Sequence, residues 1–239
     1  MARSIGILVA GEPPAELAGR FSGYGTMSEE LLRQEDPSLA FRQYQVRLGE
    51  YPAAPPDHDA WLITGSRHAA YDDLPWIHWL ADFIRAIDAA QIPLVGICFG
   101  HQLIARALGG EVQKAPQGWG VGVHQALIET RAPWMDDAQA ALNLVVSHQD
   151  QVTRLPPGAE RLAGSAFCPI AMYRIADHVF AMQAHPEFSR EYSRELMEVR
   201  RSLIGEELIG KGMASLSRET DSRAVAHWIV GFLRRAWTR

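Results

Sequence analysis

The sequence predicts an α/β protein with a doubly wound, mostly parallel sheet and a small antiparallel extension. Over the first 110 residues, short apolar runs alternate with helical patterns, which is typical of strands joined by crossover helices. After residue 110, strand-like runs follow one another with few helices between them, and this change predicts the antiparallel part. The chain then ends in helical patterns, so we expect helices to complete the fold.

In the first half, residue patterns place each expected element. The segment 41–47 alternates polar and apolar residues with period two, whereas three other runs are apolar throughout, as in buried strands. Strands are expected at 5–10, 41–47, 60–64 and 92–97, and helices at 28–34, 75–89 and 100–108. Pro75 stands in the first turn of its helix, and Gly109-Gly110 ends the third one.

In the second half, strands are expected at 121–129, 142–147, 170–175 and 178–184, followed by helices at 189–203 and 221–237. The last helix has an apolar face formed by Val225, Trp228, Ile229, Phe232 and Leu233. Segment 204–220 fits either a helix or a lid.

Composition limits the function before any motif is considered. With 239 residues and 47% hydrophobic residues, we expect one globular domain spanning 1–239. The net charge of −5 disfavours nucleic acid and anionic membranes as partners. No apolar run reaches the roughly 18 residues of a membrane span, and the run at 5–10 is too short for a signal peptide. Two separated cysteines, Cys98 and Cys168, favour a reducing compartment, so we expect a cytoplasmic protein.

The strongest local motif is Gly96-Ile97-Cys98-Phe99-Gly100, where a buried strand runs directly into a helix. This is the layout of a nucleophile elbow, with small residues two positions on either side of the reactive side chain. A helix N-terminus favours the thiolate of Cys98, and the N–H of Phe99 would face a developing oxyanion. The alternative is a buried, inert thiol, which the flanking glycines make the weaker interpretation.

A cysteine nucleophile needs a base, and His185-Pro186-Glu187 offers the best one. If these residues continue the strand at 178–184, the side chains of His185 and Glu187 project to the same side. Glu187 would then orient the imidazole, and the other ring nitrogen would face Cys98. Taken alone, a surface turn with a solvated glutamate is the more common situation; beside the elbow, the catalytic interpretation is favoured.

These motifs resemble the class I glutamine amidotransferase superfamily, and the resemblance runs from about residue 5 to residue 190. Four ordered segments carry it: Leu62-Ile63-Thr64-Gly65-Ser66, Gly96 to Gln102, Ser147 to Val152, and His185-Pro186-Glu187. Tyr71-Asp72-Asp73 and the Cys-Phe-Gly-His-Gln variant look most like free-standing members, including γ-glutamyl peptidases. The resemblance implies a flavodoxin-like fold of the class I glutamine amidotransferase type.

The resemblance also implies catalytic roles. Cys98 would attack a γ-glutamyl carbonyl and form a thioester. His185, held by Glu187, would protonate the leaving amine and then activate water. The backbone N–H groups of Phe99 and Gly65 would stabilise the oxyanion.

For binding, the resemblance implies that Gln102, Ser147 and His148 line the glutamyl site. No cofactor is implied, and the histidine spacing predicts no metal site. The partner is a small molecule, glutamine or another γ-glutamyl compound; a partner synthase stays open because no acceptor domain is recognised in these residues. The sequence thus predicts a glutamine amidotransferase-like cysteine hydrolase. The alternatives are a γ-glutamyl peptidase for glutathione-like compounds and a non-catalytic regulatory or binding module.

Several other features are interpreted as structural. We expect His101 to face a neighbouring element, Cys168 to be a spectator, and Gly118-x-Gly120-x-Gly122 to be a loop rather than a dinucleotide site. The segment 12–27 is long enough to be functional: either Tyr24 contacts substrate, or the segment is a surface connection.

Overall fold

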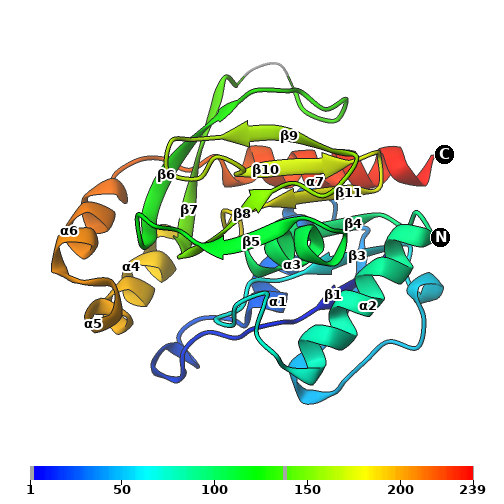
Figure 1. Cartoon of the computed structure of the whole chain (residues 1–239), viewed down its shortest axis with the longest axis horizontal. Helices are drawn as coiled ribbons and strands as arrows, with labels where there is room; N and C mark the ends of the chain where they lie inside the picture. Colours follow the sequence, from blue (N-terminus) through cyan, green and yellow to red (C-terminus); the bar gives the residue numbers. More distant parts are fainter. Residues whose placement is uncertain (1–2, 137–138, 239) are drawn as a thin grey trace.

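A large mixed sheet forms the centre of the computed structural model, which describes residues 3–136 and 139–238. Within these residues the sheet has nine strands, in the order β2-β1-β3-β4-β11-β10-β9-β6-β7 (Figure 1). The strands from β2 to β11 pair in parallel, and those from β11 to β7 pair antiparallel. This arrangement confirms the predicted α/β class with its antiparallel extension.

The strand bounds follow the chain. The parallel strands are β1 (Ser4–Leu8), β2 (Ala40–Tyr44), β3 (Ala60–Ile63), β4 (Leu94–Ile97) and β11 (Val179–Met182). The antiparallel strands are β6 (Gly120–Ile128), β7 (Ala141–His148), β9 (Ala159–Gly164) and β10 (Met172–Ile175). A separate two-stranded ribbon is formed by β5 (Glu111–Lys114) and β8 (Asp150–Arg154).

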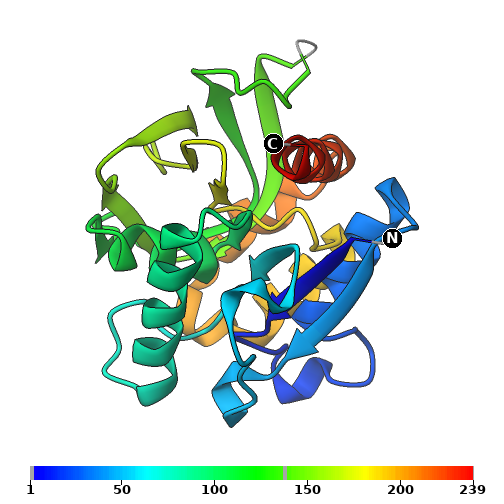
Figure 2. The same cartoon turned by 90° about the vertical axis from the view of Figure 1, so that its right-hand side faces the viewer.

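Helices cover both faces of the central parallel strands β1, β3, β4 and β11, because these strands are buried on both sides. The helices are α1 (Tyr24–Glu35), α2 (Pro75–Ala89), α3 (Phe99–Ala107), α4 (Arg190–Val199), α5 (Arg201–Ile204), α6 (Glu206–Ser215) and α7 (Ser222–Trp237). One core layer joins α1 and α7 to the sheet, and the layer on the opposite face joins α2 and α3 to it (Figure 2). Helices α4, α5 and α6 gather beside β6 and β7, at the end far from the termini (Figure 1). Short 3-10 helices span Ala15–Leu17, Val46–Leu48 and Pro55–Asp57.

Some element predictions were wrong, for identifiable reasons. Helix α1 begins at Tyr24, not at residue 28. Its start was missed because the residue before it, Gly23, has no side chain that could cap the helix. The helix expected over 189–203 ends at Val199, and a separate turn, α5, follows it. The strands β5, β8 and β9 were missed because they are short and carry many polar side chains.

The glycine segment 118–122 is only partly the expected loop, because Gly120 and Gly122 lie in β6. Gly122 has a φ of 83°, and a Cβ atom built there would lie 2.5 Å from the carbonyl oxygen of Gly212. The missing side chain therefore lets α6 approach the strand. Segment 204–220, for which the sequence pattern fits a helix or a lid, contains α6 packed on β6. In the described part of the chain, no helix is long and apolar enough to cross a membrane.

Candidate active site

Cys98 stands at the sharp turn between β4 and α3, in the middle of the sheet. Its φ of 52° and ψ of −98° lie in a region that L-residues rarely adopt. Such a conformation costs on the order of 1–3 kcal/mol and persists only where the surroundings enforce it. The backbone N–H of Cys98 donates to the carbonyl oxygen of Met182 at 2.8 Å, which ties the turn to β11.

The two glycines of the motif are required by packing. A Cβ atom at Gly96 would lie 2.8 Å from the carbonyl carbon of Gly100, and one at Gly100 would lie 2.5 Å from the carbonyl oxygen of Ile63. Any side chain at either position would push α3 away from the sheet. The motif therefore has the geometry of an elbow, with the cysteine at its apex.

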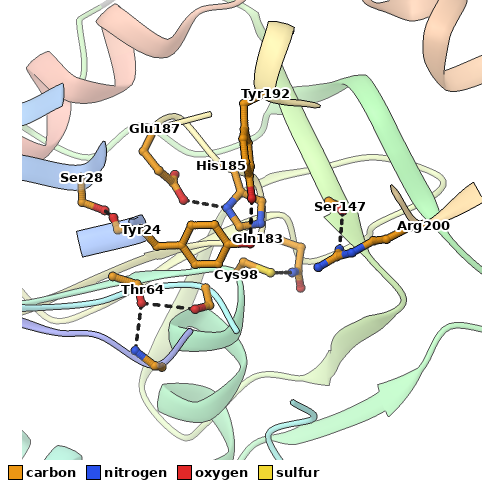
Figure 3. A network of polar contacts seen from close by, with 12 residues as sticks. Tyr24, Ser28, Thr64, Cys98, Ser147, Gln183, His185, Glu187, Tyr192 and Arg200 are labelled. Atoms are coloured by element: carbon orange, nitrogen blue, oxygen red, sulfur yellow. Dashed lines mark hydrogen bonds and ion pairs between the residues drawn. The ribbon is translucent and has the colours of Figure 1, made fainter. Parts of the chain in front are cut away.

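His185 and Glu187 lie just beyond the end of β11, the strand next to β4. Strand β11 ends at Met182, so the expected continuation through residue 184 was wrong. A turn over 186–187, rather than strand alternation, brings the two side chains together. Nδ1 of His185 lies 2.7 Å from Oε1 of Glu187, and both side chains are almost fully buried (Figure 3).

The position of His185 is fixed by two further contacts. Its ring stacks on Phe188, with ring centroids 3.9 Å apart and planes inclined by 6°. Its backbone N–H donates to the carbonyl oxygen of Val145 at 2.8 Å. The imidazole is therefore oriented by a carboxylate, an aromatic ring and the edge of β7.

The electrostatic surroundings favour a charged imidazole. Burial lowers the pKa of His185, but the Glu187 carboxylate and the hydrogen-bonded Cys98 sulfur outweigh it and raise that pKa to about 10. The second carboxylate oxygen of Glu187, Oε2, is buried with no hydrogen-bond partner among the described residues. A buried carboxylate needs a cation for compensation, and the imidazolium of His185 supplies it.

Gly65 and Phe99, the expected oxyanion donors, both adjoin Cys98. Phe99 is the first residue of α3, so its N–H has no acceptor within the helix. Gly65 follows β3, and a Cβ atom built there would lie 3.7 Å from the Cβ of Cys98 and 2.8 Å from Cε1 of His185. The absent side chain leaves room for the imidazole beside the backbone of Gly65.

Gln102 belongs to a chain of amides that ends at the cysteine. Its Nε2 donates to Oε1 of Gln183 at 3.1 Å and to the carbonyl oxygen of Asp150 at 2.8 Å. Gln183 in turn donates to Sγ of Cys98 at 3.5 Å (Figure 3). Sequence reasoning gave no role to Gln183; its place two residues before His185 was the available signal.

Cys98, Gln102, Ser147 and His148 line one cleft of about 770 Å³. The cleft is bordered by the segments 12–16, 66–72 and 199–203 as well. Sequence reasoning also missed Arg200, whose NH1 donates to Oγ of Ser147 at 2.9 Å. The residues expected to bind the glutamyl group therefore share a cavity with Cys98.

Tyr24 packs behind His185 rather than lining this cleft. Its ring lies 5.3 Å from Phe188, and its hydroxyl accepts a hydrogen bond from Tyr192 at 3.0 Å. Burial is the main cause that raises the pKa of Tyr24. Of the segment 12–27, it is residues 12–16 that border the cleft.

The remaining candidates lie in structural environments. His101 is fully buried against the ring of Tyr173, and burial lowers its pKa to about 3. His148 does line the cleft, but burial lowers its pKa to about 3 as well, and its Nδ1 lies 3.1 Å from the carbonyl oxygen of Asp150. Burial raises the pKa of Cys168 to about 12, so this thiol is protonated at neutral pH. Among the residues described, no group of three His, Cys, Asp or Glu side chains is arranged to hold a metal ion.

Comparisons with known proteins show the family to which the chain belongs. The family model for glutamine amidotransferase class-I matches residues 59–199. The chain is 32% identical to γ-glutamyl peptidase 4 of Arabidopsis thaliana over 80% of its length and 79% of that protein. It is 34% identical to one subunit of the glutamine-hydrolysing GMP synthase of Methanocaldococcus jannaschii, over 46% of this chain and 58% of that one. A solved glutamine amidotransferase from Methylobacillus flagellatus superposes with a TM-score of 0.76 at 23% identity, covering 98% of this chain and 95% of the other.

Proposed function

Because the chain belongs to the class I glutamine amidotransferase family, we propose that it hydrolyses γ-glutamyl amide bonds through a thioester on Cys98. The observation that carries the proposal is the meeting of two neighbouring strand ends. The elbow after β4 presents Cys98, and the turn after β11 presents the buried His185–Glu187 pair. The nucleophile is thus supplied by one rigid turn, and the base with its orienting carboxylate by another.

In the proposed reaction, Sγ of Cys98 attacks the γ-carbonyl carbon and forms a tetrahedral oxyanion. The N–H groups of Gly65 and Phe99 stabilise that charge. His185 gives its proton to the leaving amine, the C–N bond breaks, and a γ-glutamyl thioester remains on Cys98. His185, now neutral, takes a proton from water, which attacks the thioester; glutamate leaves and the thiolate is restored. Glu187 stabilises the imidazolium in the protonated steps.

For the substrate, we favour γ-glutamyl peptides. Relatives named γ-glutamyl peptidase match over more than two thirds of both chains, with 32% identity in two of them. The cleft of about 770 Å³ extends well beyond Cys98 along the segments 12–16 and 199–203, and this leaves room for a leaving group larger than ammonia. A peptidase can use binding energy from that part of the substrate to raise its rate.

The second candidate is an amidotransferase subunit that delivers ammonia to a synthase partner. The relatives from glutamine-hydrolysing GMP synthases, at 34% and 35% identity over about half of this chain, favour it. The third candidate, a non-catalytic module, is disfavoured by the complete Cys98, His185 and Glu187 constellation.

A substrate panel tests the proposal. The purified protein is incubated with L-glutamine and with a series of γ-glutamyl dipeptides and tripeptides, and release of glutamate and of the free amine is recorded. We expect hydrolysis that requires Cys98, with kcat/KM rising for extended substrates. Activity unchanged in the Cys98→Ser variant would overturn the thioester mechanism. Glutaminase activity that arises only with a cellular extract would instead favour the role of an amidotransferase subunit.

A further inference from the structure

Arg200 lies on the wall of the cleft that holds Cys98. It is the residue between α4 and α5, and its backbone N–H still bonds to the carbonyl oxygen of Leu196 at 3.1 Å. The helix α4 begins shortly after the turn that carries His185 and Glu187. The C-terminal end of this helix lies at the cleft that holds Cys98. In Figure 3 the guanidinium points from the end of α4 towards the side of the cleft where Cys98 and Gln183 lie.

The guanidinium is held in place by two neutral groups. It donates to Oγ of Ser147 at 2.9 Å, and its Cζ lies 5.9 Å from the centroid of the Trp119 ring. Both contacts restrict the side chain without neutralising its charge. One of five N–H donors is used by Ser147, which leaves a fork free for a planar, bidentate acceptor.

The neighbouring arginine shows how different this environment is. Arg201 forms ion pairs with Glu198 and Glu206 on the outer surface. Arg200 forms no ion pair with an Asp or Glu of the described chain, although it is half-buried. A half-buried cation held without a counter-ion favours an anionic ligand, because the ligand restores the compensation that solvent no longer supplies.

We propose that Arg200 binds the α-carboxylate of the γ-glutamyl group and thereby restricts the enzyme to substrates in which this carboxylate is free. The inference rests on the proposed γ-glutamyl hydrolase function. Ser147 is the positioning residue of this contact: its hydroxyl orients the guanidinium and leaves the fork directed into the cleft. The same chemistry could in principle serve a carboxylate on the leaving peptide, and the experiment separates the two sources.

The test measures the rate at which Cys98 is alkylated, which does not depend on turnover. A diazoketone analogue of glutamine carries the α-carboxylate and no leaving peptide, its α-amide counterpart lacks the charge, and iodoacetamide lacks the amino-acid part. For Arg200→Gln we expect labelling by the diazoketone to slow roughly 10- to 100-fold. Labelling by the α-amide and by iodoacetamide should stay within about twofold of the wild-type rate, because no charge-assisted contact is lost.

Two control variants sharpen the result. Arg194→Gln removes an exposed arginine from the same helix, and labelling should keep the wild-type rate. Lys114→Gln removes another cation of the same cleft, one that is exposed and without an ion pair in the described chain. If labelling by the diazoketone slows as much in Lys114→Gln as in Arg200→Gln, the effect is a general attraction between cations and the anionic reagent. That result would overturn the proposed contact of Arg200 with the α-carboxylate.

The remaining outcomes separate this inference from the proposed function. Equal slowing of the carboxylate and α-amide reagents, or none with either, overturns the role of Arg200 while the hydrolase proposal stands. A loss confined to γ-glutamyl peptides with a free C-terminal carboxylate places the contact on the leaving group and also overturns it. If no substrate is cleaved, calorimetry measures instead how tightly the protein binds L-glutamate and its α-amide. If glutamate binds, its α-amide does not, and binding requires Arg200, the contact between Arg200 and the α-carboxylate is supported and the hydrolase proposal is refuted. Equal binding of the two ligands refutes the contact.

Discussion

Strands β4 and β11 lie side by side and run parallel, yet the connections that leave them are built in opposite ways. The turn after β4 is fixed by the backbone: a positive φ at Cys98, with Gly100 packed against the carbonyl oxygen of Ile63. The turn after β11 is fixed by side chains: a buried ion pair between His185 and Glu187, and a ring stacked on the imidazole. The difference indicates that the nucleophile depends on steric strain, whereas the base depends on charge.

Breaking the charge should have the largest effect on activity. Glu187→Gln keeps the shape of the turn but removes the anion that stabilises the imidazolium. By analogy with the carboxylate of serine protease triads, kcat should fall by about 10²- to 10⁴-fold, less than in His185→Ala. Steady-state hydrolysis of the best γ-glutamyl substrate measures this, and full activity in Glu187→Gln would mean that the pair is only structural.

The same ion pair should make stability depend on pH. The pKa of His185 is about 10 in the folded protein, against an ordinary value of 6.5. Because the folded value is higher, the stabilisation is fully present below about pH 6.5 and is lost as the pH rises towards about 10. In Glu187→Gln the carboxylate that raises the pKa of His185 is gone, whereas burial still lowers that pKa. The loss of stability between pH 6.5 and 10 should therefore be smaller in this variant. Urea unfolding followed across that pH range checks the comparison; identical slopes in both proteins would contradict it.

Disturbing the close packing of the elbow at Gly100 should lower the stability of the fold. Gly100→Ala places a methyl group 2.5 Å from a carbonyl oxygen of β3, so we expect a loss of about 1–3 kcal/mol in the free energy of unfolding. Gly210→Ala is the matched control, since Gly210 lies in α6 with open space around it; there the substitution should stabilise by about 0.5–1 kcal/mol. Chemical denaturation gives both values, and a neutral Gly100→Ala would argue against a tightly packed elbow.

Relieving the backbone strain at Cys98 should have the smallest effect, a small change in stability. Cys98→Gly and Cys98→Ala both remove the thiol, but only glycine adopts a φ of 52° without a Cβ penalty. We expect Cys98→Gly to be more stable than Cys98→Ala by about 1 kcal/mol, the reverse of the usual order of these residues. Thermal unfolding of the two variants measures the difference; alanine as the more stable variant would mean that the turn is unstrained.

The same contrast explains what the sequence could predict. The elbow was recognisable because its requirements are local: an apolar run, two glycines and a cysteine at fixed spacing. The predicted contact between His185 and Glu187 is present, but a turn forms it instead of the expected strand, because a short segment such as 183–187 fits either structure. Gln183 and Arg200 contact partners 85 and 53 positions away, and such contacts leave no periodic pattern. The strands β5 and β8, which pair with each other outside the main sheet, were missed because both are short and polar.

The most direct test of the central claim compares the two cysteines. Wild-type protein, Cys98→Ser and Cys168→Ser are treated at neutral pH with a diazoketone analogue of glutamine, and adducts are counted by intact mass. Cys168 is buried with its pKa raised to about 12, so only Cys98, beside the imidazolium of His185, should react. The account predicts one adduct in the wild type, one in Cys168→Ser and none in Cys98→Ser. Labelling of both cysteines, of neither, or of Cys168 alone would contradict it.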